Sequence, residues 1–277
     1  MLVELAIGDA YGAGFEYASR AFLRSGNTLA GYVRHPRHGI EPGRYTDDTQ
    51  MSIAVAEAIV SGRRWTRSML AEMFVTAYKR DPREGYALRF QEFLSRCESG
   101  EQFRAEIRPH SDKSGAAMRA APIGVYPTIG EVLERCRTQA ALTHDTPDGI
   151  AAACAAALMA HYFRYRLGPA ASLGEFLCAH VPGQWDVPWH GKVGPKGWMS
   201  VRAAITAVVG SHGLSEVLRR SVDFTGDVDT VAAIALAAGS CSDELEPNLP
   251  GHLVEGLENG PYGRDYLAAL DQRLLHT

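Results

Sequence analysis

Apolar residues recur along most of the chain at the three-to-four-residue spacing of α-helices, and no useful stretch alternates strictly between apolar and polar positions. The clearest run, 150–167, is apolar on most of its faces, which predicts a helix buried in the middle of a helical domain. Helix start signals precede other runs: Thr66 before a helix ending near Lys79, the pair Thr128 and Glu131, and Pro147 at a first turn.

The same pattern predicts further helices and one fold class. We expect an all-α protein with about a dozen helices, folded as a single compact orthogonal multi-helix domain over residues 1–277. Ser172 and Glu175 form a second capping-box pattern. The other expected helices cover 1–15, Asp48 or Thr49 to Val60, 84–97, 116–121, 199–211, 214–222, 229–238 and 261–275.

Two long stretches lack helical periodicity, 20–45 and 181–198. Connections of this length in a compact domain are usually functional. The first is basic, and we interpret it as a lid over an anionic ligand or as a solvated loop. The second holds three of the four tryptophans, 185, 189 and 198, as a cover on the core or as a wall that stacks a base and holds phosphates.

Composition excludes several classes of function. The 277 residues carry a net charge of -4, which gives no electrostatic footprint for nucleic acid or anionic membrane. No apolar stretch approaches the ~20 residues of a membrane span, and the first residues lack a signal-peptide pattern. Five cysteines are dispersed without a CxxC pair, as in reduced cytoplasmic proteins. We expect a cytoplasmic monomer whose thiols pack in the core.

Two short acidic motifs stand out, Tyr45–Met51 and Gly226–Thr230. Each places two carboxylates and at least one threonine directly before an apolar helical run. One such residue suffices to cap a helix. Several together favour a cation site, because buried carboxylates need a positive charge between them. Oxygen ligands suit hard divalent cations, so we expect Mg²⁺ or Mn²⁺ before Zn²⁺. Helix capping alone is the alternative for either motif.

The first fifteen residues are rich in alanine and glycine and predict a helix that enters a closely packed site. Gly8 and Gly12 lie four residues apart and would share a helical face, where small residues allow another element or a ligand to approach. Asp9 and Glu16 lie seven apart and would be roughly aligned on the same helix. A solvated helix end is the alternative interpretation for Glu16.

Several segments, taken in order, resemble the ADP-ribosylglycohydrolases, the relatives of dinitrogenase reductase-activating glycohydrolase and of the ADP-ribosyl-acceptor hydrolases. The resemblance spans residues 6–239, and its specific elements are TDDTQM and GDxDT. The segments are Gly8–Gly12 with Glu16, Tyr45–Met51, Ser114–Arg119, Thr143–His144 and Gly226–Ile234.

This resemblance implies an all-α fold with a site for two divalent cations, Mg²⁺ or Mn²⁺, at the base of a cleft. It implies cleavage of the N- or O-glycosidic bond between ADP-ribose and a protein or small-molecule acceptor. Glu16 resembles a glutamate near the metals, and we expect Glu16, Asp47 or Asp48 to serve as general acid or base. The metal shell implied by position is Thr46, Asp47 and Asp48 in one half, and Asp227, Asp229 and Thr230 in the other.

The turn that begins at Ser114 resembles the glycine-rich turn whose backbone amides hold the distal ribose and diphosphate. A loop that enters a helix at Ala116 would present free N–H groups to an anion. His144 resembles a ligand-contacting histidine, with a purely structural histidine as the alternative. The expected substrate-binding residues are Asp112, Ser114, Gly115, Ala116, Met118 and His144.

Two departures from the family pattern bear on the chemistry. Ser114 stands where asparagine is usual, and Asp112 lies near the position of an aspartate found just upstream of this turn in hydrolases of ADP-ribosylarginine. Thr225 stands before the GDVDT motif where glycine is common. The acceptor and the catalytic acid or base therefore stay open.

We weigh three functions. The first is a metal-dependent ADP-ribosyl hydrolase. The second is a catalytically silent ADP-ribose-binding protein on the same fold. The third is a hydrolase of another small ribosyl or nucleotide substrate, since a fold does not fix chemistry.

Overall fold

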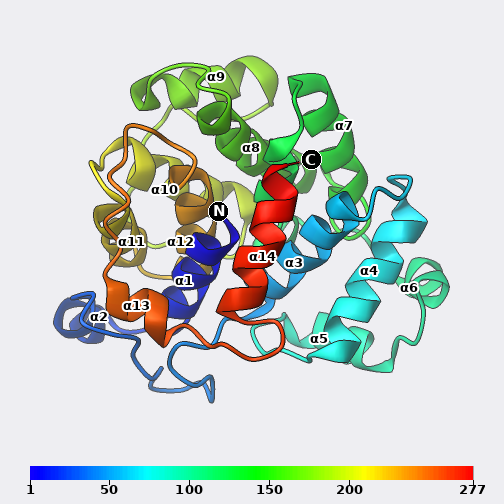
Figure 1. The fold of residues 1–277 in the computed structure, drawn as a ribbon, viewed down its shortest axis with the longest axis horizontal. Helices are drawn as coiled ribbons and strands as arrows, with labels where there is room; N and C mark the ends of the chain where they lie inside the picture. Colours follow the sequence, from blue (N-terminus) through cyan, green and yellow to red (C-terminus); the bar gives the residue numbers. More distant parts are fainter. Residues whose placement is uncertain (277) are drawn as a thin grey trace.

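The fold is organised around two helices, α1 (Leu2–Ala13) and α12 (Val228–Gly239), which contact each other more extensively than any other pair. In the computed structural model, which describes residues 1–276, they lie side by side near the centre (Figure 1). A Cβ atom on Gly8 would lie 2.5 Å from the carbonyl oxygen of Ala232, and one on Gly12 would lie 2.4 Å from Asp229 Cα. The two glycines therefore permit the close approach predicted from their spacing.

Four long helices surround this pair: α3 (Asp47–Val60), α8 (Pro147–Arg164), α10 (Gly197–Val209) and α14 (Arg264–Leu275). Helix α8 is buried on nearly all sides, as its apolar sequence predicts. Buried apolar side chains from all of these helices form one continuous cluster. This core supports the single-domain organisation, which stays a prediction.

The remaining helices complete the fold, and the described residues contain only isolated bridges and no strand. The all-α prediction is therefore confirmed. The remaining elements are α2 (Arg20–Gly26), α4 (Arg67–Arg80), α5 (Leu88–Arg96), α6 (Gly100–Glu106), η1 (Ser114–Ala116), η2 (Ala121–Val125), α7 (Ile129–Ala140), η3 (Ala170–Ser172), α9 (Leu173–His180), α11 (Leu214–Asp223) and α13 (Gly251–Gly256).

The predicted helix starts hold at three places. The Thr66 side chain accepts a hydrogen bond from the N–H of Met69 at the start of α4, and Thr128 does the same for Glu131 in α7. Pro147 occupies the first turn of α8. The prediction for Ser172 was wrong, because its side chain makes no capping bond.

Other boundaries also need correction. The segment 84–97 becomes helical only at Leu88, because Gly85 adopts a positive φ of 103° that a helix cannot accommodate. The segment 116–121 is not an α-helix but joins two short 3₁₀ helices, the second with a proline in its first turn. The helices α2, α6 and α13 were not predicted, since six or seven residues are too few to show a period.

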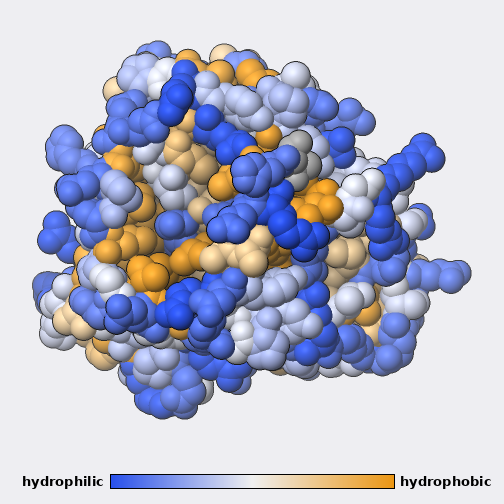
Figure 2. All heavy atoms as spheres, in the orientation of Figure 1, coloured by the Kyte–Doolittle hydropathy of each residue, from blue (hydrophilic) through white to orange (hydrophobic). Residues whose placement is uncertain are grey.

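Apolar residues gather over the middle of the face drawn in Figure 2, with hydrophilic residues around them. In the same orientation, Figure 1 places α1, α12 and α14 beneath this region. None of the helices within residues 1–276 is both long enough and apolar enough to cross a bilayer.

Candidate metal centre

The first acidic motif is held by a residue of another helix. Asp9, fully buried on α1, accepts hydrogen bonds from the N–H and hydroxyl of Thr46 at 2.9 and 2.7 Å. It also accepts from the N–H and hydroxyl of Thr49 at 2.9 and 2.6 Å. Thr46 occupies the N-cap position of α3 but makes no capping bond of its own, so Asp9 supplies the cap from outside.

Because Asp9 caps the helix, the carboxylates of Asp47 and Asp48 are not needed as caps. This argues against helix capping as their role. From the sequence, Asp9 was recognisable only as a polar residue of the first helix. Its place in the GDAYG segment, between the two glycines that face α12, was the available signal.

The second acidic motif is shaped by a left-handed turn. Thr225 and Gly226 have φ values of 67° and 93°, and a Cβ atom on Gly226 would lie 1.8 Å from the carbonyl oxygen of Val193. The N–H of Asp227 donates to that same carbonyl at 3.2 Å, and the N–H of Tyr17 donates to the carbonyl of Gly226 at 2.8 Å. The turn therefore fixes Asp227 and draws the segment after α1 against it.

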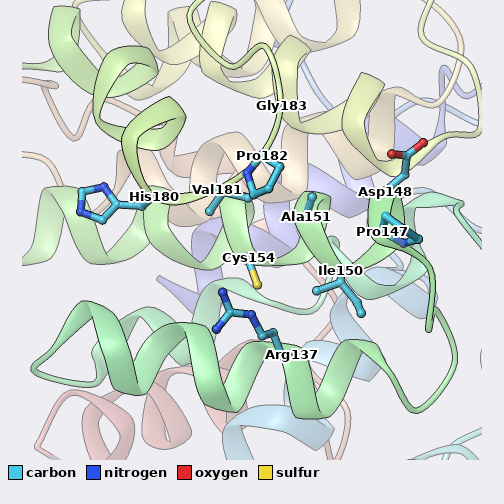
Figure 3. Close-up of a pocket in the computed structure, with 10 residues that line it drawn as sticks. All are labelled: Arg137, Pro147, Asp148, Ile150, Ala151, Cys154, His180, Val181, Pro182 and Gly183. Atoms are coloured by element: carbon cyan, nitrogen blue, oxygen red, sulfur yellow. The ribbon is translucent and has the colours of Figure 1, made fainter.

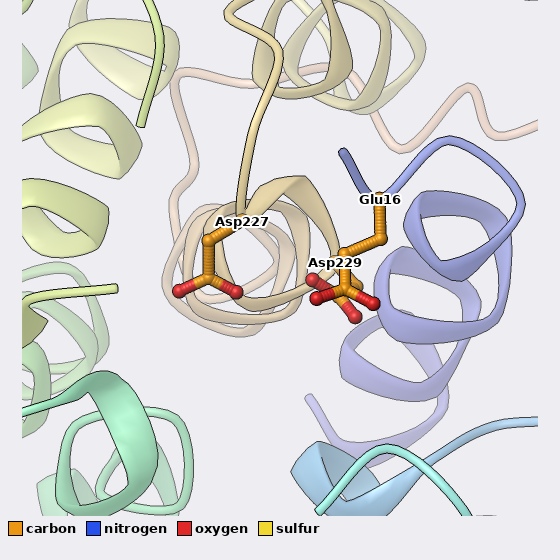
Figure 4. A group of neighbouring side chains, drawn as sticks. All are labelled: Glu16, Asp227 and Asp229. Atoms are coloured by element: carbon orange, nitrogen blue, oxygen red, sulfur yellow. The ribbon is translucent and has the colours of Figure 1, made fainter. Parts of the chain in front are cut away.

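Glu16 reaches the second motif from this segment. One oxygen from each of Glu16, Asp227 and Asp229 lies within 4.8 Å of the others (Figure 4). The expectation that Asp9 and Glu16 share one helix was wrong, because α1 ends at Ala13 and Glu16 lies in the following turn. Glu16 is half-buried and its carboxylate lies beside two buried aspartates, which argues against the solvated-helix-end alternative.

The two motifs meet across the site. The Thr230 hydroxyl contacts both Asp48 and Asp227, and these hydrogen bonds oppose the effect of burial on the two pKa values. Burial, reinforced by the charges of neighbouring carboxylates, raises the pKa of Asp47, Asp48 and Asp229 well above its usual range.

Burial also raises the pKa of Glu16 to about 7, with the Asp227 and Asp9 charges acting in the same direction and Arg37 opposing them. Arg37 lies on the basic stretch, and its guanidinium donates to the Tyr17 carbonyl at 2.8 Å. The ring of His35 contacts the Glu16 carbonyl at 2.7 Å. The basic stretch is therefore attached to the Glu16 turn, whereas its role as a lid stays a prediction.

The residues present fit a hard divalent cation. The Asp48 Oδ1 atom is buried and has no hydrogen-bond partner, which is costly for a carboxylate unless a cation completes its environment. The surrounding donors are carboxylate and hydroxyl oxygens, the ligands that Mg²⁺ and Mn²⁺ prefer. The carboxylates of the cluster are Asp9, Glu16, Asp47, Asp48, Asp227 and Asp229.

The predicted binding turn adjoins this cluster. The Ser114 hydroxyl contacts the Asp227 carboxylate, as does Ser200 Oγ at 3.1 Å. However, the N–H of Ser114 donates to the Pro195 carbonyl, and those of Ala117 and Met118 donate to the Ser114 carbonyl. These amides are bonded inside the protein and are not available to an anion.

Met118 lies deeper in the core than Ser114 and Gly115 of the predicted binding turn. Its side chain is only 4% exposed, its N–H is engaged, and its carbonyl accepts from Ser52 Oγ. Met118 therefore packs against helix α3, and the proposed binding turn consists of Ser114 to Ala116. Ala116 has a fully buried side chain as well, so only its backbone can face a ligand.

His144 lies beside the binding turn. A Cβ atom on Gly115 would be 3.1 Å from His144 Cε1, so the turn and the ring touch. Nδ1 of the ring is 2.7 Å from the hydroxyl of Thr143, which accepts in turn from Arg119 at 2.8 Å. Burial, reinforced by the Arg119 charge, lowers the pKa of His144 to about 3. The ring is therefore neutral and held in place.

Asp112 is engaged in an ion pair with Lys196, and the lysine hydrogen bond holds the pKa of the carboxyl below its usual range. Its carbonyl accepts from the N–H of Gly197 at 3.0 Å. The pair joins the segment before the binding turn to the start of α10. Asp112 is thus ionised and paired, which suits positioning better than proton transfer.

The tryptophan stretch divides into two parts. Trp185 is 2% exposed and donates to the Val181 carbonyl at 3.1 Å, which is the packing role. Trp189 and Trp198 are half-buried, form an edge-to-face pair at 5.7 Å, and both lie against the Arg202 guanidinium. Stacking of a base on these two rings stays a prediction.

Comparison with known proteins places the chain in a family. The ADP-ribosylglycohydrolase profile matches residues 1–277. ADP-ribosylhydrolase ARH3 of Xenopus tropicalis is 30% identical over 189 residues, which are 64% of this chain and 53% of that protein. ADP-ribosylarginine hydrolase Tri1 of Serratia proteamaculans is 22% identical over 257 residues, which are 84% of this chain and 67% of that protein. The chain thus spans about half the length of the first of these relatives.

A solved structure shares the fold. A chain of an ADP-ribosylglycohydrolase-related protein complex superposes with a TM-score of 0.76, over 99% of this chain and 95% of that one, at 24% sequence identity. This likeness concerns the fold, whereas the profile covers the chain from end to end and includes both acidic motifs. The protein therefore belongs to the ADP-ribosylglycohydrolase family.

Proposed function

We propose that this protein is a metal-dependent hydrolase that cleaves the glycosidic bond between ADP-ribose and an acceptor. The convergence of two acidic motifs and Glu16 on one buried cluster, with Asp48 Oδ1 left without a partner, carries this proposal. The names of the two relatives, an ADP-ribosylhydrolase and an ADP-ribosylarginine hydrolase, support ADP-ribose as the common part of the substrate.

The cluster would hold two divalent cations, Mg²⁺ or Mn²⁺. Bound there, the cations would supply Lewis-acid polarisation of sugar and water oxygens. Asp9 does not need to contact a cation in this proposal, because its two oxygens already accept bonds from Thr46 and Thr49. The proposed ligands are Thr46, Asp47, Asp48, Asp227, Asp229 and Thr230, with oxygen donors throughout.

Glu16 is the proposed general acid or base. It comes from a different segment than the two motifs, its carboxylate lies beside those of Asp227 and Asp229, and the Tyr17 and His35 contacts hold its backbone. From there it could take a proton from water or give one to the leaving group. Asp47 and Asp48 are the alternatives for this role.

The carboxylates have a second effect. Glycoside cleavage passes through an oxocarbenium-like transition state, which carries positive charge on the sugar ring. A ring that lies against this cluster gains electrostatic stabilisation as that charge develops, because the negative groups are already fixed in place. Burial strengthens the effect by excluding water.

The turn from Ser114 to Ala116 is the proposed seat of the ADP-ribose moiety. It links the cluster, through Ser114 and Asp227, to the neutral ring of His144 behind Gly115. The Asp112–Lys196 ion pair borders the same turn and joins it to the start of α10.

The test is release of free ADP-ribose from defined substrates. The panel contains ADP-ribosylated arginine, serine, guanidino compounds and nucleic-acid ends, each assayed with Mg²⁺, with Mn²⁺ and with EDTA. We expect release from at least one substrate with metal and none with EDTA. Calorimetric ADP-ribose binding without release from any substrate would instead identify a silent binding protein. Metal-dependent turnover confined to another ribosyl compound would identify a different hydrolase.

A further inference from the structure

A second chemically distinctive place lies away from the acidic cluster. Helices α7, α8 and the end of α9 enclose a cavity of about 360 Å³ whose lining contains none of the residues of the proposed metal centre. The sulfur of Cys154, on α8, points into this cavity toward the guanidinium of Arg137, on α7 (Figure 3). His180 and Asp148 complete the polar part of the lining.

A second thiol lies directly behind Cys154. Cys136, on α7, is fully buried, and because α7 packs against α8 the two thiols lie close enough to influence each other's pKa. Hydrogen bonding to Cys136 lowers the pKa of Cys154, with Arg137 acting in the same direction against the effect of burial. Burial raises the pKa of Cys136 itself. A thiol that lines a cavity beside a second, buried thiol is the arrangement expected of a redox-sensitive pair.

The other three cysteines lack this arrangement. Cys97 is buried, and its sulfur contacts the Ser99 carbonyl at 3.3 Å. Cys178 is exposed, and Cys241 is half-buried next to its own helix carbonyl, that of Ala237. All five cysteines are free thiols in the structure, but exposed Cys178 does not pack in the core as the sequence analysis expected.

We propose that Cys154 and Cys136 form a peroxide-sensitive pair, in which Cys154 reacts through the cavity and Cys136 closes a disulfide with it. In the first step the Cys154 thiolate attacks one oxygen of a peroxide, the O–O bond breaks, and a sulfenic acid and hydroxide form. In the second step the Cys136 sulfur attacks the Cys154 sulfur, the S–O bond breaks, and water leaves with the proton of Cys136. The peroxide takes both electrons, so two thiols and hydrogen peroxide give one disulfide and two waters.

The burial of Cys154 limits which reagents reach its sulfur. Cys154 is only 2% exposed although it lines the cavity, so a small peroxide reaches its sulfur more readily than a bulky alkylating reagent. Exposed Cys178 shows no such preference, because either reagent reaches it. This difference gives the pair a chemical signature of its own.

The pair is connected to the turn proposed to seat ADP-ribose. Gln139 contacts the Cys136 sulfur through Nε2 at 3.7 Å, and the same nitrogen donates to the Ala116 carbonyl at 3.0 Å. Arg119 donates to Gln139 Oε1 at 2.8 Å and also to the Thr143 hydroxyl, which contacts His144. The hydrogen-bond network therefore connects Cys136 to His144 as well. Drawing Cys136 toward Cys154 would remove its contact with Gln139. We therefore expect the disulfide to loosen the turn from Ser114 to Ala116. Only the role of this turn in binding ADP-ribose rests on the proposed function.

Peptide mapping by mass spectrometry tests the pair. The full chain carrying Cys178→Ser, which removes the exposed thiol, is treated with hydrogen peroxide and digested without reductant. We expect a linked pair of peptides containing Cys136 and Cys154, with a loss of two hydrogens that dithiothreitol reverses. Absence of this link while Cys154 stays reduced, or oxidation of Cys154 to products that do not include Cys136, would overturn the proposal.

Single variants test the order of the steps. In the Cys136→Ser protein we expect a sulfenic acid on Cys154 that dimedone traps, and in the Cys154→Ser protein we expect Cys136 to stay reduced. A dimedone-trapped sulfenic acid on Cys136 would contradict the proposal that Cys154 reacts first. Alanine replacements at both positions guard against a buried serine that unfolds the helix pair, with thermal melting as the check of folding.

Hydrogen exchange tests the connection to the turn. The amides of Ala117 and Met118 donate to the Ser114 carbonyl and report on the closed turn. We expect faster exchange of these amides in the peroxide-treated protein and no change in the treated Cys136→Ala protein. Unchanged exchange in a protein shown to contain the disulfide would refute the connection. Neither result depends on hydrolase activity, so failure here is distinguishable from failure of the proposed function.

Discussion

The carboxylate of Asp9 accepts hydrogen bonds from both the N–H and the hydroxyl of Thr46, across the contact between α1 and α3. Through this bond the first helix fixes the start of the helix that carries Asp47 and Asp48. Glu16 follows the same first helix by one turn. The position of α1 therefore sets the distance between the catalytic candidate and one half of the proposed metal shell.

Replacing Asp9 by asparagine is expected to weaken both stability and metal binding. An amide NH₂ group would face the N–H and hydroxyl donors of Thr46 and Thr49, and hydrogen bonds to a charged group are worth about 1.5–3 kcal/mol each. We expect the free energy of unfolding of Asp9→Asn to fall by at least about 2 kcal/mol in urea denaturation. Calorimetry should show weaker Mg²⁺ or Mn²⁺ binding, since the start of α3 is no longer held.

Asp243→Asn is the matched control. Asp243 is exposed and pairs with Arg166 at the surface, where such pairs contribute little. We expect its unfolding curve and metal affinity to equal those of the wild type. If Asp9→Asn were as stable as this control, Asp9 would not be what holds the start of α3 in place.

Asp229→Asn tests the metal centre, because we expect it to raise the stability of the protein without metal and to lower the stability gained from metal. In EDTA the variant has one fewer buried negative charge and is expected to be more stable than the wild type, because neighbouring carboxylates repel Asp229. Metal at a hundred times its Kd should add about 2.7 kcal/mol to the wild type and nothing to the variant. Thermal melting across a Mn²⁺ titration measures both effects.

Asp47→Asn is the companion variant from the other motif and should behave in the same way. Metal stabilisation retained in both variants would contradict a site shared by the two motifs. Glu134→Gln, which changes an exposed carboxylate on α7, controls for the loss of one negative charge.

The sequence was sufficient to predict the fold class and the two acidic motifs, because helical periodicity and clustered carboxylates are local signals. It could not reveal that Asp9 caps α3, since that bond joins residues thirty-seven positions apart. The helix containing Gly8 and Gly12 was predicted correctly, but its end at Ala13 was not, so the path to Glu16 was wrong. Short 3₁₀ segments around Ser114 also escaped, and with them the internal bonding of the binding turn.

Thr225 shows how a departure from a family pattern gains meaning from the structure. The resemblance placed glycine at this position, and the residue adopts a φ of 67°, a conformation that costs a β-branched residue about 1–2 kcal/mol. We expect Thr225→Gly to raise the free energy of unfolding by about 1 kcal/mol, after part of the gain is lost to the greater flexibility of the unfolded chain. A decrease in urea denaturation would show that the buried threonine side chain contributes more than the strain costs.

The buried ring of His144 predicts a dependence of stability on pH. Burial lowers its pKa to about 3, whereas an unfolded histidine titrates near 6.5. Between these values the unfolded state binds more protons, so the contribution of His144 is complete above about pH 6.5 and is lost as the pH falls. At about pH 5 the loss amounts to about 2 kcal/mol.

Chemical denaturation of the wild type and His144→Gln at both pH values isolates this effect. The stability difference between the two proteins should shrink by about 1.6 kcal/mol on going from about pH 6.5 to about pH 5. His190→Gln, which changes an exposed histidine, should show no such change. A pH-independent difference between the wild type and His144→Gln would mean that the ring titrates normally and is not buried as described.

Glu16→Gln separates catalysis from assembly of the site. Glutamine has nearly the same shape, and the backbone contacts of Tyr17 and His35 that hold this turn do not involve the carboxylate. We therefore expect the variant to keep its fold and its ADP-ribose affinity. General acid or base catalysis typically contributes ~10²–10⁴-fold, so turnover on the best substrate of the panel should fall at least about a hundredfold.

The metal affinity of Glu16→Gln decides between two roles. The carboxylate lies beside Asp227 and Asp229, close enough to act on the reacting groups or to serve as a ligand itself. An acid or base leaves Mn²⁺ affinity near that of the wild type while kcat falls and KM does not, because the lost interaction belongs to the transition state. Parallel loss of Mn²⁺ affinity and turnover would make Glu16 a ligand. Turnover within a fewfold of the wild type would exclude Glu16 from the chemistry and leave Asp47 and Asp48 as the candidates, since Asp112 is already paired with Lys196.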